Sequence, residues 1–69
     1  MSKARNMRKF EVKKRLEGGG FGLVVGHVWK DNGRWDGKTL GGAKLPVATH
    51  GSYKQTAMAW VEEAGSREL

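Results

Sequence analysis

The segment from Phe21 to Gly33 constrains the fold of this chain most, because it has the pattern of a β-strand followed by a hairpin turn. Its side chains alternate with period 2, which predicts one face with Phe21, Leu23, Val25, His27 and Trp29 and another with Gly22, Val24, Gly26, Val28 and Lys30. Asp31-Asn32-Gly33 follows, and Asn and Gly tolerate the positive φ of a tight turn. A returning strand is therefore expected over residues 35–40.

Another strand is predicted before this hairpin, where Phe10, Val12 and Leu16 recur in phase with period 2. The glycine run at 18–20 favours a hairpin loop between this strand and the one that starts at Phe21. A phosphate-binding glycine loop is not expected here, because such a loop leads into a helix rather than a strand.

An amphipathic helix is predicted over residues 52–65. Its apolar stripe at helical spacing consists of Tyr53, Ala57, Trp60, Val61 and Ala64. Ser52 and Gln55 have the spacing of a capping box, and Gly65 is placed to end the helix in a left-handed conformation.

These elements predict an α+β fold in which a three-stranded antiparallel sheet is covered on one face by the C-terminal helix, because that face is the only apolar partner for the stripe. The predicted core comprises Phe10, Val12, Leu23, Val25, Ala57, Trp60, Val61 and Ala64. We expect a disordered basic tail at residues 1–8, a single small domain at 9–65 and a C-terminal tail at 66–69.

Composition excludes several classes of function. The 69 residues include no cysteine, so disulfide frameworks and cysteine-rich zinc sites are excluded. His27 and His50 lack the spacing of a metal site, and no nucleophile or acid–base pair is suggested, so we expect no enzyme activity and no cofactor. The absence of cysteine, of a long apolar span and of a secretory signal favours a cytoplasmic protein.

Positive charge is concentrated at the N-terminal end. The formal net charge of +6 lies within the first 15 residues, and the rest of the chain is neutral. Such an end attracts polyanions, and nucleic acid is the commonest of them. A membrane is not expected as a partner.

The basic side chains of the strands extend this argument to the sheet. If Phe10 and Val12 face the helix, Lys9, Lys13 and Arg15 lie on the outward face together with the glycine-rich face of the next strand. A surface of this kind allows close approach of nucleic acid. The predicted DNA-binding residues are Lys3, Arg5, Arg8, Lys9, Lys13, Arg15, Lys30 and Arg34.

Two segments carry a resemblance to a known arrangement: Val28-Trp29-Lys30-Asp31-Asn32-Gly33-Arg34-Trp35 and Gly51-Ser52-Tyr53-Lys54-Gln55-Thr56-Ala57-Met58-Ala59-Trp60. With the order of three strands and a helix, they resemble the arm-type DNA-binding domain of tyrosine-recombinase integrases and the plant ethylene-response-factor domain. The resemblance implies that the sheet lies in the major groove of double-stranded DNA. It also implies an accessory factor of a phage or mobile element, which in a phage would act in the host cytoplasm. The middle of the predicted outward face lacks the arginines and aromatic residues that this family uses on bases.

Two alternatives are left open by the sequence. The basic end suits equally a small protein-interaction module or phage-encoded inhibitor that binds an acidic surface of a host protein. RNA binding is the other alternative, and it requires an aromatic side chain on the outward face, which Trp29 supplies only if it points outward.

Overall fold

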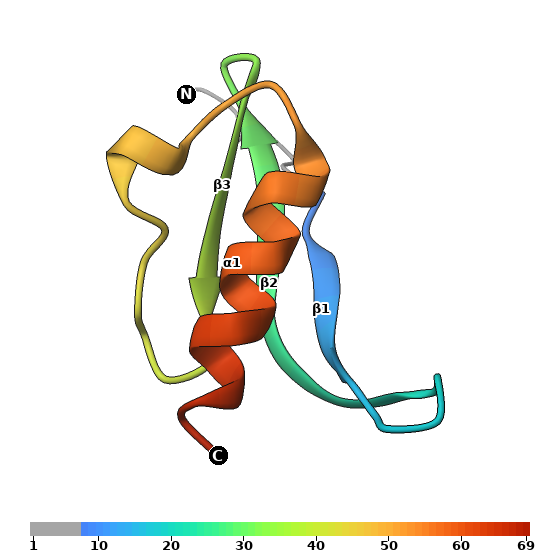
Figure 1. Cartoon of the computed structure of the whole chain (residues 1–69). Helices are drawn as coiled ribbons and strands as arrows, with labels where there is room; N and C mark the ends of the chain where they lie inside the picture. Colours follow the sequence, from blue (N-terminus) through green and yellow to red (C-terminus); the bar gives the residue numbers. More distant parts are fainter. Residues whose placement is uncertain (1–7) are drawn as a thin grey trace.

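A computed structural model describes residues 8–69 as a sheet with a helix across one of its faces (Figure 1). In chain order the elements are β1 (Phe10–Arg15), β2 (Phe21–Asp31), β3 (Arg34–Thr39), the short 3-10 helix η1 (Val47–Thr49) and α1 (Lys54–Ser66). The strands form an antiparallel sheet in the order β1-β2-β3, and α1 contacts all three. The predicted α+β architecture is confirmed. Apart from Arg8, the tail expected at residues 1–8 lies outside the described residues.

Both hairpin turns form where the sequence predicts them. Asn32 and Gly33 have φ values of 54° and 78°, and the pair joins β2 to β3 as a two-residue turn. Gly18 and Gly19 also have positive φ, at 92° and 97°, in the loop between β1 and β2. These conformations are open to asparagine and glycine at low cost, so the local sequence fixes both reversals.

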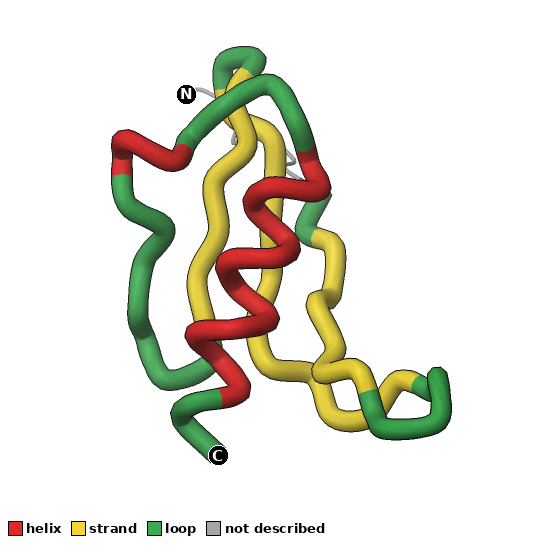
Figure 2. Tube along the Cα trace, viewed as in Figure 1, coloured by secondary structure: helices red, strands yellow, loops and turns green. Residues whose placement is uncertain are grey.

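The segment between β3 and α1 runs along the free edge of β3 (Figure 2). Isolated bridges pair Lys38 with Lys44 and Trp35 with Gly51, and the amide of Leu45 donates to the carbonyl of Gly37 at 2.9 Å. These contacts bring the side chain of Leu45 into the core, where only 3% of it is exposed.

An irregularity in β2 changes which residues face the helix. Val12 pairs with Gly26 whereas Lys13 pairs with Val24, so Val25 is an extra residue in β2 and forms a β-bulge. The bulge inverts the alternation of the strand, and both Val25 and Gly26 are buried. The predicted outward face of β2 is therefore wrong from Gly26 onward, because Gly26 and Val28 lie under α1, whereas Val24 pairs with Lys13.

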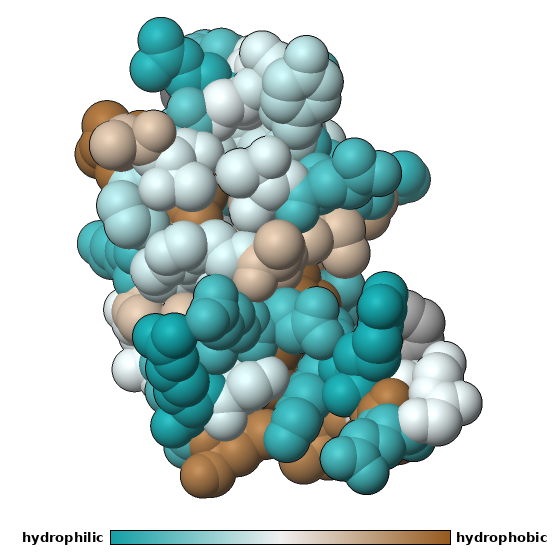
Figure 3. Space-filling model, viewed as in Figure 1, coloured by the Kyte–Doolittle hydropathy of each residue, from teal (hydrophilic) through white to brown (hydrophobic). Residues whose placement is uncertain are grey.

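The core is built from Val12, Val25, Val28, Leu45, Ala57 and Val61, with Phe10, Trp35, Met58 and Trp60 packed against it. Val12, Val25, Ala57 and Val61 were predicted in this role. The prediction that Leu23 belongs to the core is wrong, because its side chain is 66% exposed. Ala64, which was also predicted in the core, is only half-buried. Seen from the α1 side, the surface is largely hydrophilic, and apolar side chains gather at the end near the C-terminus (Figure 3).

The helix ends differ from the prediction. The N-cap is Tyr53 rather than Ser52, and no side chain caps the first turn. Gly65 lies within the helix, which continues to Ser66, so it does not terminate α1 in a left-handed conformation. Glu68, just beyond the helix, accepts hydrogen bonds from the hydroxyl of Thr39 at 2.7 Å and the amide of Gly41 at 3.0 Å.

Candidate nucleic-acid interface

The sheet face opposite α1 is the most distinctive polar surface of the molecule, and within residues 8–69 no helix covers it (Figure 1). Strand alternation and register assign its residues. We call this surface the open face; by alternation its side chains are Lys9, Glu11, Lys13, Arg15, His27, Trp29, Asp31, Arg34, Asp36 and Lys38.

Trp29 lies on β2, the central strand of the sheet, and is partly exposed. The ammonium of Lys9 lies over its ring, with Nζ 5.2 Å from the ring centroid. A cavity of about 290 Å³ lies beside the ring and is lined by Lys9, Trp29, Asp36, Gly37, Lys38 and Lys44. An aromatic ring and three ammonium groups from separate segments therefore border one hollow.

Asp36, the acidic residue of this cavity, is held by the loop beside β3. Its Oδ1 accepts a hydrogen bond from the amide of Gly37 at 2.7 Å and lies 3.0 Å from Nε2 of His50. The same Nε2 lies 3.1 Å from the carbonyl oxygen of Leu45, so this nitrogen carries the proton and donates to acceptor atoms on both sides. The carboxylate thus contacts His50 in the loop and the amide of Gly37 in β3.

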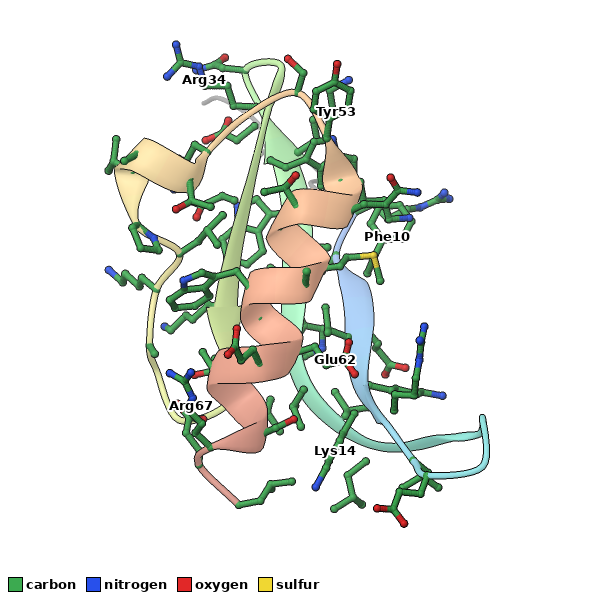
Figure 4. All side chains as sticks on the ribbon, in the orientation of Figure 1. Phe10, Lys14, Arg34, Tyr53, Glu62 and Arg67 are labelled. Atoms are coloured by element: carbon green, nitrogen blue, oxygen red, sulfur yellow. The ribbon has the colours of Figure 1, made fainter. Side chains whose placement is uncertain are left out.

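The structure brings together only part of the predicted DNA-binding set. Lys9 and Lys13 lie on the open face as expected, and Lys3 and Arg5 lie outside the described residues. Arg34 lies beside the β2–β3 turn (Figure 4). In the register it is opposite Asp31, and it shares the alternation of Asp36 and Lys38 on the open face.

The remaining predicted residues are Lys30, Arg8 and Arg15. The prediction that Lys30 lies on the outward face of the sheet is wrong. Lys30 shares the alternation of Val28 and therefore lies on the helix side. Cζ of Arg8 lies 5.9 Å from the centroid of Phe10, a ring that packs against the core. The amide of Arg15 donates to Oε2 of Glu62 on α1 at 2.9 Å, and its exposed side chain shares the alternation of Lys13, which places it on the open face at the end of β1.

Lys38 and Lys44 were missed by the sequence analysis although a signal existed for Lys38. A two-residue turn at Asn32-Gly33 sets the register of the hairpin, which places Trp29 opposite Asp36 and His27 opposite Lys38. Lys44 had no such signal, because a bridge across the irregular loop positions it.

A second hollow lies at the free edge of β1, between this strand and α1. It measures about 450 Å³, and Val12, Met58 and Ala59 contribute apolar surface to it. Charges of both signs line it as well, from Glu11, Lys13, Arg15 and Glu62. This mixture gives no preference for an anionic ligand, in contrast to the cavity beside Trp29.

Comparison with family models, curated proteins and solved structures finds no match to this chain. The helices of residues 8–69 include none that is long and apolar enough to cross a membrane. The same residues contain no group of three or more histidine, cysteine, aspartate or glutamate side chains placed to hold a metal ion.

Proposed function

We propose that this chain is a non-enzymatic nucleic-acid-binding protein, and that its open face and its basic N-terminal segment contact the phosphates. The observation that carries the proposal is the clustering of Lys9, Lys38 and Lys44 around Trp29. Lys13 adds a further positive charge on the same face. Lys3 and Arg5 supply the charge of the N-terminal segment.

The electrostatics of the face support a polyanionic ligand. Asp36 supplies the carboxylate that lines the cavity beside Trp29, and this carboxylate already contacts His50 and the amide of Gly37. Each lysine that neutralises a phosphate releases a condensed counterion, which makes affinity depend on salt. The slope of log affinity against log salt is about −0.9 per phosphate contact on duplex DNA and about −0.7 on a single strand.

Substitution of two open-face lysines tests the proposal. We expect Lys38→Gln combined with Lys44→Gln to weaken binding at low salt and to reduce the steepness of the salt slope by about 1.4 to 1.8. The measurement is fluorescence anisotropy of labelled oligonucleotides over a series of salt concentrations.

Arg67→Gln is the control for position, because it removes one positive charge from the end of α1, on the opposite layer, where the double variant removes two from the open face and its cavity (Figure 4). We expect this variant to keep the wild-type slope. Absence of binding at low salt, or an affinity that does not change with salt, would contradict the proposal and favour the protein-interaction alternative.

A further inference from the structure

Trp29 occupies a position that the packing of the core does not explain. Phe10, Trp35 and Trp60 pack against the core from the α1 side, and the rings of Phe10 and Trp35 lie 5.8 Å apart. Trp29 lies on the other face, because the bulge at Val25 turns Gly26 and Val28 toward the helix. A large aromatic ring is thus kept at the surface among lysines.

The geometry points to single-stranded nucleic acid as the ligand of the open face, with an unpaired base stacked on Trp29. This inference rests on the proposed function and specifies its substrate class. Unpaired bases stack on aromatic side chains, whereas bases within a duplex are stacked on one another and offer only their edges in the grooves.

The surroundings of the ring suit a base with its adjoining phosphates. The cavity of about 290 Å³ lies against Trp29, and Lys9, Lys38 and Lys44 line it. Nζ of Lys9 lies over the ring, 5.2 Å from its centroid, and all three lysine side chains are exposed. A stacked base would take the place of this ammonium, which would then reach a neighbouring phosphate.

The open face has few of the side chains that read a duplex. Bidentate contacts to base edges in the major groove come from arginine or lysine on guanine and from asparagine or glutamine on adenine. The strand positions around Trp29 offer only Arg34 and Lys38 of this set, with His27 and Asp36 beside them, and the carboxylate of Asp36 contacts His50. Contacts to phosphate and to the face of a base predict binding with little sequence preference.

Replacement of Trp29 tests this inference with a short oligothymidine, an oligouridine of the same length and a random-sequence duplex as ligands. We expect the wild-type protein to bind both single strands more tightly than the duplex, and to bind them with similar affinity because no contact to the sugar is invoked. Trp29→Leu should weaken single-strand binding by about 5- to 150-fold, the range for loss of one stacked base. Its salt slope should not change, because the lysines are retained.

Two further variants serve as controls. Trp29→Phe should restore most of the affinity, because a smaller aromatic ring still stacks. Tyr53→Leu removes an aromatic ring that is 74% exposed at the start of α1 (Figure 4) and should have no effect. Stacking also quenches tryptophan emission, so oligothymidine should quench the wild-type protein but not Trp29→Phe, whose remaining tryptophans are Trp35 and Trp60. This readout does not require Trp29→Leu to fold.

The outcomes separate the inference from the proposed function. If no oligonucleotide binds at low salt, both are wrong. If the duplex binds as tightly as the single strands, or if Trp29→Leu weakens all ligands equally, nucleic-acid binding stands and stacking on Trp29 is overturned. Equal quenching of the wild-type protein and Trp29→Phe would also overturn it, as would a strict preference for one sugar.

Discussion

Three glycines lie where α1 crosses the sheet, and a methyl group added to any of them would collide with a neighbour. A Cβ at Gly37 would lie 2.8 Å from Cγ2 of Val61, and one at Gly65 would lie 2.7 Å from Cβ of Val25. At Gly26 it would lie 2.5 Å from the carbonyl oxygen of Lys38. The helix can therefore approach the sheet closely because these positions lack side chains.

Gly65→Ala tests this close approach. In an open helix interior the change stabilises by about 1 kcal/mol. Here the new methyl group would also lie 2.7 Å from the carbonyl oxygen of Val25, and overpacking of this kind costs about 1–3 kcal/mol. We expect a lower Tm in thermal unfolding followed by circular dichroism. Gly51→Ala is the control and should leave the Tm unchanged, because the nearest atom lies 4.0 Å away. A rise in the Tm of Gly65→Ala would mean that α1 does not approach Val25 of β2 as closely as the structure shows.

At the scale of elements, the sequence predicts those features that have local causes. The Asn32-Gly33 turn, the glycine loop and the amphipathic helix each follow from a few adjacent residues, and all are present. The ends of α1 differ because tertiary contacts decide them. A bridge to Trp35 fixes Gly51 just before the expected cap, and packing on Val25 keeps Gly65 helical.

The face of β2 could not be read from alternation alone. Leu23, Val24, Val25 and Val28 are apolar at both parities, so the sequence is compatible with either face toward the helix. The bulge at Val25 is specified by pairing with β1, which is a non-local contact. Because the orientation of Trp29 depends on this bulge, the wrong assignment of the faces of β2 also placed Trp29 on the wrong side of the sheet.

Matched lysine substitutions in β2 distinguish the two assignments of its faces. Val28 is fully buried, so Val28→Lys places an unpaired ammonium in the core, which costs several kcal/mol and is enough to unfold a small domain. Leu23→Lys adds the same charge at a side chain that is 66% exposed, where substitutions usually change stability by no more than about 0.5 kcal/mol. Circular dichroism should show loss of folded signal for Val28→Lys and a nearly unchanged Tm for Leu23→Lys. The reverse result would restore the simple alternation and remove Trp29 from the open face.

In the molecule as a whole, the hydrophobic core and the candidate binding surface lie on opposite sides of the sheet. Contacts between α1 and all three strands bury the core on one side of the sheet. The opposite side is left to carry Trp29 and the lysines around it. This division means that open-face variants can be made without altering the core, so losses in binding and losses in stability can be measured separately.

Removal of residues 1–7 tests how the N-terminal charge adds to the open face. We expect the shortened chain to keep its Tm, because the core begins with Phe10 and Val12. The deletion removes Lys3 and Arg5, two of the seven basic side chains within the first 15 residues. If both contact phosphates, the salt slope on a single strand should become shallower by up to about 1.4. Affinity should fall by the same factor for every sequence, because phosphate contacts carry no sequence information.

Full-length protein with Lys3→Gln and Arg5→Gln separates charge from chain length. We expect it to match the deletion in anisotropy titrations over a series of salt concentrations, while the preference for single strands persists because Trp29 is unchanged. A deletion that weakens binding without the double substitution doing so would assign the effect to other groups in residues 1–7. Unchanged affinity of both proteins at low salt would exclude this segment from the interface and leave the open face to account for all binding.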